Sequence, residues 1–221
     1  MVAENRSQGK VTSSSKSRAG VTLTELCVVT AMILVLTGLS LPSLHRILDN
    51  ARVKAAAGQL ASFYEQSRIR ATQDDTYYEL LLSPPGVTPS QVCLDLNGDG
   101  VCGANEPQVE LSLAVSVADA GAVPPALALA PSTLGFSPLT TASSTMYNQQ
   151  NGLVPGLAWN GRGLPCQRTS PTSTCLAISG SGWVQYLQLT RSPTDEIYAA
   201  VAVGPTGRIK VWTTGGSNNW F

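Results

Sequence analysis

The sequence predicts an α+β protein in which a long N-terminal helix, hydrophobic in its first half, packs on an antiparallel β-sheet. Three observations support this fold class. Residues 26–44 contain no charged side chain, residues 46–73 show a helical hydrophobic period, and the apolar period changes to two after residue 74. Helices and strands that are separated along the chain in this way are typical of α+β folds.

The composition limits the functions to be considered. The 221 residues carry 14 basic and 14 acidic side chains, and 13% of residues are charged, against roughly 25% in ordinary soluble proteins. A zero net charge argues against a surface built throughout to hold nucleic acid. The single histidine, His45, excludes triads and metal sites that need several imidazoles. We therefore expect a protein that is not an enzyme.

The first 20 residues form a polar, basic leader. They contain Arg6, Lys10, Lys16 and Arg18 against Glu4, with several serines and no apolar run. Such a segment has no core of its own and is excluded from the folded domain. Without it, the chain keeps ten basic and thirteen acidic side chains, a net charge of −3.

Residues 21–45 are predicted to be the transmembrane half of the helix. The nineteen charge-free residues 26–44 would extend roughly 28 Å as a helix, close to the thickness of a bilayer core. Basic residues before the span predict a cytoplasmic N-terminus, with the rest of the chain across the membrane. A signal peptide or signal anchor explains both features. Neither explains Glu25, whose burial at the start of the span costs at least a few kcal/mol unless it is paired.

Residues 19–26 resemble the prepilin signature. After Ala19 and Gly20 the chain has Val-Thr-Leu-Thr-Glu-Leu, where that family usually has Phe-Thr-Leu-Ile-Glu after the glycine. The resemblance implies that a prepilin peptidase cuts after Gly20 and methylates the new N-terminus at Val21. Glu25 is then the fifth mature residue, and Pro42 is the twenty-second, where pilins commonly carry a proline that kinks the helix.

The resemblance implies a subunit of a type IV pilus or of the fibre of a type II secretion system. Glu25 would be offset by the α-amine of Val21 in a neighbouring subunit, which turns a costly buried charge into an assembly contact. The implied partners are other pilins or pseudopilins, the peptidase, and the bacterial inner membrane before assembly. Short strings at residues 67–71, 159–165 and 204–211 are similar to GspH/FimT pseudopilins in particular.

Residues 46–73 are predicted to continue the helix as an amphipathic half, and residues 74–221 to form a β-rich periplasmic domain. The buried face of the helix is expected to consist of Val53, Ala56, Ala57, Leu60, Phe63, Tyr64, Ser67 and Ala71. Strands are expected at residues 77–82, 92–96, 109–117, 156–159, 174–178, 183–189, 197–203 and 208–213. Residues 120–161 carry no charge and are expected to be long connections, with room for one edge hairpin.

Four cysteines lie in the predicted exported domain. Cys93 and Cys102 are separated by eight residues, and so are Cys166 and Cys175. In an oxidising compartment two short-loop disulfides are expected, although pairing of Cys93 with Cys166 or Cys175 stays open. A four-thiolate zinc site is disfavoured, because it needs more closely spaced pairs. Cys27 lies in the span and is expected to be an apolar core residue.

Residues 95–106 match the calcium-loop template D-x-[DN]-x-[DN]-G-x5-E at every specified position. Ca²⁺ takes six to eight oxygen ligands in such loops. The residues that would supply them are Asp95, Asn97 and Asp99 through side chains, Val101 through its carbonyl, and Glu106 through a bidentate carboxylate. The flanking helices of the template are missing, because the preceding residues are predicted as strand. The alternative is a solvated Asn-Gly/Asp-Gly turn, but the full-length match favours Ca²⁺.

A nucleic-acid site is an alternative at the C-terminal strand. Arg208, Lys210 and Trp212 would share one face of that strand, because side chains alternate. Two cations beside an aromatic ring can hold phosphates and stack a base. Some members of the resembled family bind DNA through a Gly-Arg-x-Arg turn here, and this chain has Gly-Arg-x-Lys. A solvent-facing strand after a tight turn is favoured, since the sequence shows no other clear basic cluster in the domain.

The sequence thus leads to three functional hypotheses. The preferred one is a structural fibre subunit that assembles through its N-terminal helix and Glu25. The second is a minor pilin that captures DNA for transformation with Arg208 and Lys210. The third is a periplasmic calcium-binding domain on a signal anchor.

Overall fold

The computed structural model describes residues 20–82, 88–118, 129, 131–138, 157–167, 174–192, 195–214 and 220–221, without the side chains of residues 39–43, 131, 138, 190–192 and 195. The chain divides into two compact units, Met1–Ser43 and Leu44–Phe221. This boundary lies close to the predicted border after residue 45, and it places the second half of the helix in the β-rich unit. The predicted leader, apart from Gly20, lies outside the described residues.

Helix α1, Leu23–Gln73, is the long N-terminal helix that the sequence predicts. Thr22 caps its start, because the Thr22 hydroxyl accepts a hydrogen bond from the Glu25 N–H at 3.3 Å. Thr30 and Thr37 donate their hydroxyls to carbonyls four residues back, at 3.0 Å and 2.8 Å, so both polar groups are satisfied within the helix. Over the residues described here, no helix combines the length and the apolar character needed to cross a bilayer.

Within the second unit, one face of α1 is buried. The predicted face is confirmed at every position, namely Val53, Ala56, Ala57, Leu60, Phe63, Tyr64, Ser67 and Ala71. Ser67 fits there because its hydroxyl donates to the Phe63 carbonyl at 2.7 Å. Asp49, which is not among the positions of the predicted face, is also buried, and it accepts a hydrogen bond from Arg52 Nη1 at 3.1 Å. The helix ends just before Asp75, which adopts a φ of 45°.

Two antiparallel sheets form, where the sequence predicts one. The strands are β1 Tyr78–Leu82, β2 Gln91–Asp95, β3 Gln108–Glu110, β4 Ser116–Ala118, β5 Ser137–Pro138, β6 Ala158–Trp159, β7 Pro165–Gln167, β8 Leu176–Ala177, β9 Ser181–Ser192, β10 Asp195–Val203 and β11 Ile209–Thr213. The first sheet has the order β3-β2-β1-β6-β7-β8 and the second the order β11-β10-β9-β4. The short β5 pairs with β9 in parallel. The α+β class with antiparallel sheets is therefore confirmed.

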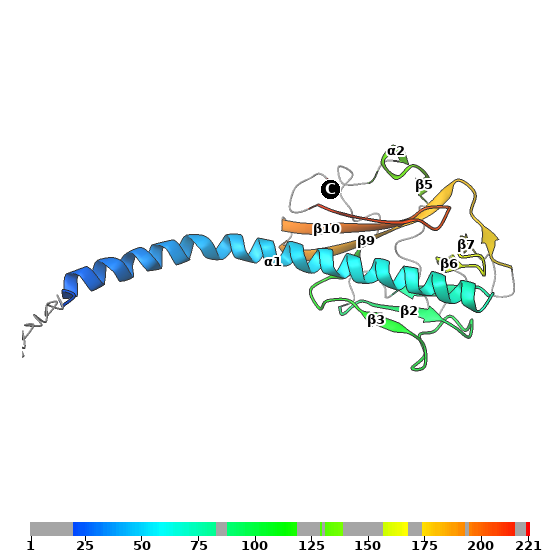
Figure 1. Ribbon diagram of the computed structural model, residues 1–221, viewed down its shortest axis with the longest axis horizontal. Coiled ribbons are helices and arrows are strands. Elements are labelled where there is room, and N and C mark those ends of the chain that lie inside the picture. Colours follow the sequence, from blue (N-terminus) through cyan, green and yellow to red (C-terminus); the bar gives the residue numbers. More distant parts are fainter. Residues whose placement is uncertain are drawn as a thin grey trace, which may run out of the picture. The chain divides into compact units, whose positions relative to one another are not determined.

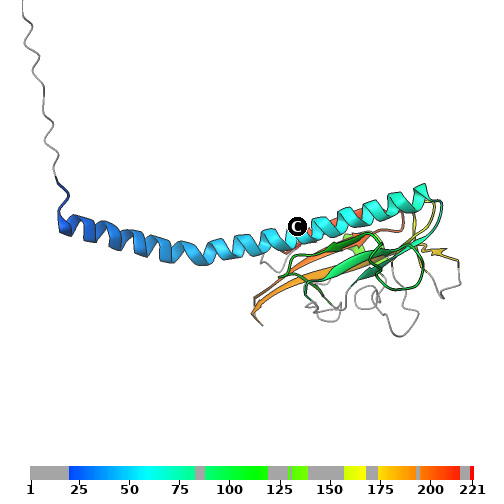
Figure 2. The same cartoon turned by 90° about the horizontal axis from the view of Figure 1, so that it is seen from below.

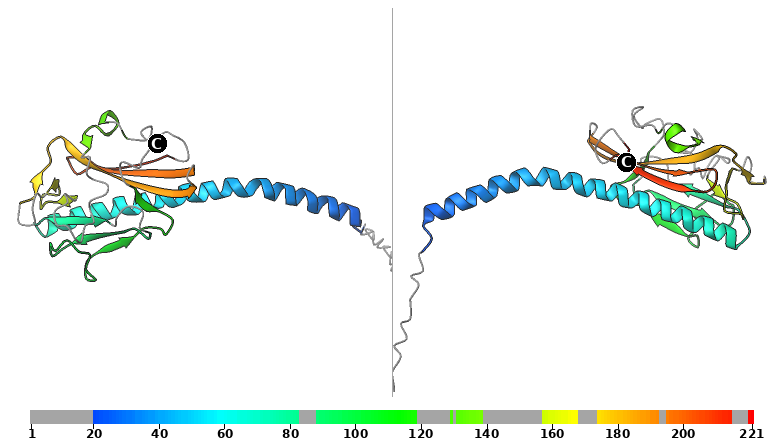
Figure 3. Two further views of the ribbon diagram at one scale, coloured as in Figure 1. Left: turned by 180° about the vertical axis from the view of Figure 1, so that it is seen from behind. Right: turned by 45° about the horizontal axis from the view of Figure 1, so that its top comes forward.

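The main core lies between α1 and the two sheets (Figures 1 and 2). Leu60 and Tyr64 of α1 pack in one apolar cluster with Trp159 from the first sheet and Trp183 from the second. A second cluster lies on the opposite face of the second sheet, because side chains alternate along β9 and β10. The short helix α2, Pro131–Leu134, and β5 lie over that face, on the side away from α1 (Figure 3).

Two stretches differ from the strand prediction. The strand expected at residues 109–117 is split into β3 and β4, which belong to different sheets. They are joined by a turn in which the Val115 N–H donates to the Ser112 carbonyl at 2.8 Å. Strands β5 and β7 have no counterpart in the prediction. Most of the charge-free stretch 120–161 lies outside the described residues, and its described parts include α2, β5 and β6.

Candidate functional site

The start of α1 exposes a continuous apolar surface. Val21 exposes 71% of its surface, Leu23 is still more exposed, and Glu25 is exposed in the first turn. Large apolar side chains are also exposed along the following turns, namely Leu26, Val28, Val29, Met32, Ile33, Leu34, Val35 and Leu36. Successive helix residues point in directions about 100° apart, so these side chains cover the whole circumference of the segment.

The predicted cleavage and assembly residues lie at this helix start. A Cβ built on Gly20 would have open space around it, and Gly20 directly precedes Val21. Further along, Val28, Met32 and Val35 help to line a shallow groove whose walls are entirely apolar. A helix that is apolar on all sides is normally covered by lipid or by other protein. The side chain of Pro42, also predicted to serve assembly, lies outside the described part of the chain.

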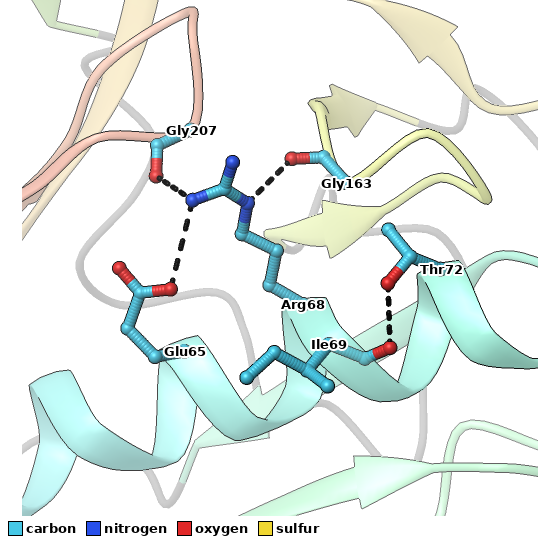
Figure 4. A network of polar contacts seen from close by, with 6 residues as sticks. All are labelled: Glu65, Arg68, Ile69, Thr72, Gly163 and Gly207. Carbon is cyan, nitrogen blue, oxygen red and sulfur yellow. Dashed lines mark hydrogen bonds and ion pairs between the residues drawn. The ribbon is translucent and has the colours of Figure 1, made fainter.

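Arg68 holds two distant turns together near the end of α1 (Figure 4). Its Nε–H donates to the Gly163 carbonyl at 2.9 Å, and its Nη1–H donates to the Gly207 carbonyl at 3.3 Å. Nη1 also lies 3.6 Å from the Glu65 carboxylate. One planar guanidinium, with donors fixed in a fork, thus connects α1 to the β6–β7 turn and to the β10–β11 turn.

Both residues whose carbonyls accept hydrogen bonds from Arg68 must be glycine. Gly163 and Gly207 have φ values of 70° and 80°, in the left-handed region. A Cβ on Gly163 would lie 2.9 Å from Thr72 Cγ2, and one on Gly207 would lie 2.9 Å from the Gly163 carbonyl oxygen. The two turns are therefore in direct contact. Arg162 directly precedes Gly163, so its backbone lies in the turn that contacts Gly207.

The three residues of the predicted nucleic-acid site lie at the end of this second turn and along β11. Lys210 and Trp212 share a face as predicted, with Lys210 Nζ 5.6 Å from the centre of the Trp212 ring. Arg208 is exposed and directly precedes the strand. Among the described residues, neither Arg208 nor Lys210 forms an ion pair with a carboxylate. Sequence reasoning missed Arg162 as a neighbour, because only the folded chain brings the two turns together.

The loop of residues 95–106 begins at the last residue of β2 and contains two buried carboxylates. Asp95 is 2% exposed and Glu106 is 8% exposed. The Asp95 carboxylate accepts hydrogen bonds from the Gly98 N–H at 2.6 Å and the Gly100 N–H at 2.8 Å. The Glu106 carboxylate accepts two backbone N–H bonds, at 2.8 Å and 2.7 Å. These bonds fold the loop around both acids.

The carboxylates of Asp95, Asp99 and Glu106 lie close enough in this loop for their charges to interact. Burial raises the pKa of Asp95, and the charges of Glu106 and Asp99 raise it further, while two backbone N–H groups lower it. Asn97 and Asp99 are exposed, and Asn97 Nδ2 donates to the Asp99 carboxylate at 2.8 Å. The Val101 N–H donates to the other Asp99 oxygen at 2.8 Å. A donor set of carboxylate, amide and carbonyl oxygens fits the chemistry of Ca²⁺.

The described side chains do not themselves form a closed metal site. Over the described ranges, no group of three or more His, Cys, Asp or Glu side chains is gathered closely enough to hold a metal ion. The oxygens of Asp95 and Glu106 are instead bonded to backbone N–H groups. The loop therefore has the residue types of a calcium site in a conformation that hydrogen bonds within the loop and the Cys93–Cys102 disulfide stabilise.

Both predicted disulfides are present. Cys93 is bonded to Cys102 and Cys166 to Cys175, with Cα separations of 5.8 Å and 5.3 Å. The alternative pairings of Cys93 are thereby excluded. The first disulfide ties β2 to the middle of the 95–106 loop. Cys27 is a free, exposed cysteine on the apolar segment of α1.

The fold and these sites define an α+β protein with two antiparallel sheets, two disulfides and an N-terminal helix that exposes apolar side chains on every side. Compared with protein-family models, curated proteins and solved structures, the chain matches none.

Proposed function

We propose that the protein is a structural, non-catalytic subunit of an extracytoplasmic fibre, a pseudopilin or minor pilin of a type II secretion system or a type IV pilus. The observation that carries this proposal is the exposed apolar surface of α1, which begins directly after the expected cleavage site at Gly20. Burying such a surface against copies of the same helix contributes a favourable free energy of roughly 25 cal/mol per Å² of apolar area. The surface is therefore suited to lateral packing of helices in a fibre.

Before assembly, the same segment would anchor the chain in the bacterial inner membrane as a single span. This part of the proposal rests on the charge-free run of residues 26–44, which includes residues 39–43, whose side chains lie outside the described part. Four basic residues precede the run and favour a cytoplasmic N-terminus. The two disulfides belong to the second unit and suit an oxidising periplasm.

The first prediction concerns N-terminal processing. Co-expression with a prepilin peptidase is expected to yield a mature chain that begins at Val21 and carries one added methyl group on its α-amine. Mass spectrometry of the purified protein measures both changes. Gly20→Leu should block cleavage, because the resembled signature has glycine directly before the bond that the peptidase cuts. The open space around Gly20 means that the substitution should not disturb the chain itself. Cleavage at another position, or processing of Gly20→Leu at the same rate, would contradict the fibre proposal.

A DNA-binding minor pilin is the second candidate, favoured by the contact between the two turns that Arg68 joins. This contact joins the turn that carries Arg162 to the turn that precedes Arg208, which adds a third basic residue to the two that the sequence alone indicates. Phosphate contacts of this kind give affinity that falls steeply with salt. The net charge of −3 without the leader confines any contact with DNA to this local surface.

A calcium-binding role of the 95–106 loop is the third candidate, and it is compatible with the first. The buried carboxylates of Asp95 and Glu106 repel one another, and a bound cation would offset that repulsion. Asp95, Asn97, Asp99 and Glu106 would hold the ion with side-chain oxygens, and Val101 with its carbonyl. The ion would stabilise the loop and any subunit contact that the loop makes.

The second prediction tests this candidate by thermal unfolding with Ca²⁺ and with a chelator. Ca²⁺ at a hundred times its dissociation constant is expected to stabilise the fold by about 2.7 kcal/mol, because a ligand that binds only the native state shifts the equilibrium. Asp95→Asn should remove the difference. Glu110→Gln, which removes a carboxylate in β3 outside the loop, is the matched control and should keep it. If the parent protein melted at the same temperature with Ca²⁺ and with the chelator, the loop would be a turn that binds no metal.

A further inference from the structure

A small pocket lies beside the β10–β11 turn, on the face of the second sheet that α2 covers. Its volume is about 190 Å³. The side chains that give it chemical character are Leu134 and Phe136 on one side and Pro205, Thr206, Arg208 and Lys210 on the other. The pocket therefore combines an apolar wall with a cationic one.

Two glycines leave room for the apolar wall, namely Gly182 in β9 and Gly204 directly after β10. A Cβ on Gly182 would lie 2.5 Å from Phe136 Cε2, and one on Gly204 would lie 3.5 Å from Phe136 Cε1. The Phe136 ring therefore packs directly against the backbone of Gly182. A side chain at position 182 would displace the ring. Pairing of β5 with β9 in the residues after Phe136 holds the ring in this position.

The cationic wall is formed by a closed turn. The Gly204 N–H donates to the Arg208 carbonyl, and the Gly207 N–H donates to the Gly204 carbonyl, both at 2.8 Å. Arg208 and Lys210 are the charged residues among those described as lining the pocket, and no carboxylate is among them. Two cations without a carboxylate partner produce a positive potential inside a concave surface.

We propose that this pocket binds a single oxyanion, a phosphate or carboxylate, that is attached to a small apolar or aromatic body. The anion would contact Arg208 and Lys210, and the apolar body would lie against Phe136. A volume of 190 Å³ is below the roughly 300–1,000 Å³ of pockets for drug-sized ligands, so the pocket takes one such group rather than an extended ligand. The site uses two residues of the DNA-binding candidate but does not depend on it.

Arg68 is the positioning residue for this site. It does not line the pocket, but its bond to the Gly207 carbonyl holds the turn between Thr206 and Arg208, which do. Its second bond, to Gly163, uses the other turn as a fixed support. Lysine at position 68 keeps the charge but has no fork to reach two carbonyls at once. Arg68→Lys should therefore weaken binding although the cationic wall is intact.

The third prediction is tested by titrating phenyl phosphate into the 221-residue chain in a non-ionic detergent and following the ligand by ³¹P and ¹H NMR. Saturable binding is expected. Arg208→Gln should weaken it about tenfold, because a charge-assisted hydrogen bond is lost. Phe136→Ala should weaken binding of phenyl phosphate more than binding of inorganic phosphate. Arg68→Lys should weaken binding several-fold at an unchanged number of sites.

Arg162→Gln is the matched control. It removes the same charge from the adjoining turn, but Arg162 does not line the pocket, so the affinity for phenyl phosphate should stay the same. Non-saturable binding, or equal weakening by Arg162→Gln and Arg208→Gln, would show diffuse attraction by charge and would overturn the proposal. Duplex DNA titrated in parallel distinguishes the DNA-binding surface from the small-anion pocket. If Arg162→Gln loses DNA binding but keeps its affinity for phenyl phosphate, the two are separate sites.

Discussion

Replacing Leu60 with alanine is expected to lower the free energy of unfolding by about 2–5 kcal/mol. Leu60 is 0% exposed and lies on the face of α1 that packs against both sheets. The substitution removes apolar contacts and leaves a cavity between rigid elements that cannot close it. Urea unfolding in detergent, followed by tryptophan fluorescence, measures the change, because Trp159 and Trp183 are buried in the same cluster.

Ile47→Ala is the matched control on the same helix. Ile47 lies in the same compact unit but is 63% exposed, so its truncation should change the unfolding free energy by less than about 0.5 kcal/mol. Under the fibre proposal, the same variant should reduce incorporation into fibres, because an exposed apolar residue of α1 is available to neighbouring helices. Equal destabilisation by both variants would contradict the buried face described here.

The buried face of α1 was predictable because helical periodicity and burial have the same cause. Apolar residues that recur every three to four positions can reach a core only on one side of a helix, so eight positions could be named from the sequence. Asp49 was not predictable in this way. It is a charged residue at a buried position of the second unit, where Arg52 donates a hydrogen bond to it. Neither feature has a periodic signature.

Longer strands were predictable from alternating apolar residues between turns, whereas the division of residues 109–117 and the short strands β5 and β7 were not. The change of sheet between β3 and β4 occurs at Leu111, Ser112 and Leu113, an alternating pattern that favours one continuous strand. The structure separates them because the chain turns at Ser112 and leaves Leu113 exposed. Pairing between sheets is a tertiary property, and local alternation carries no information about it.

The two hydrogen bonds by which Arg68 joins the β6–β7 and β10–β11 turns could not be predicted from the sequence. Its acceptors are the backbone carbonyls of Gly163 and Gly207, which lie 95 and 139 residues away, and a carbonyl has no residue signature. The strings at residues 67–71, 159–165 and 204–211 contain Arg68, Gly163 and Gly207, but nothing in them indicates that these residues bind one another. The disulfides were predictable for the opposite reason, because each closes a loop of eight intervening residues.

Glu25→Gln is expected to block incorporation into fibres while the chain is still cleaved and inserted in the membrane. Under the fibre proposal, the Glu25 carboxylate pairs with the α-amine of Val21 in the adjacent subunit within an apolar surrounding. Removing one partner of a buried ion pair leaves the other charge uncompensated, which costs about 3–5 kcal/mol and corresponds to a loss of at least a hundredfold. Quantifying the protein in sheared fibres against the membrane fraction measures this effect.

Thr24→Ala is the control for this variant, because it changes the neighbouring exposed residue without altering charge. The helix start should survive in both variants: the cap uses the Thr22 hydroxyl and the backbone N–H of residue 25, which glutamine retains. A failure of Glu25→Gln to assemble is therefore attributable to the lost charge and not to a lost helix. If the variant entered fibres as well as the parent protein, Glu25 would have another role, and the exposed apolar surface would have to direct assembly by packing alone.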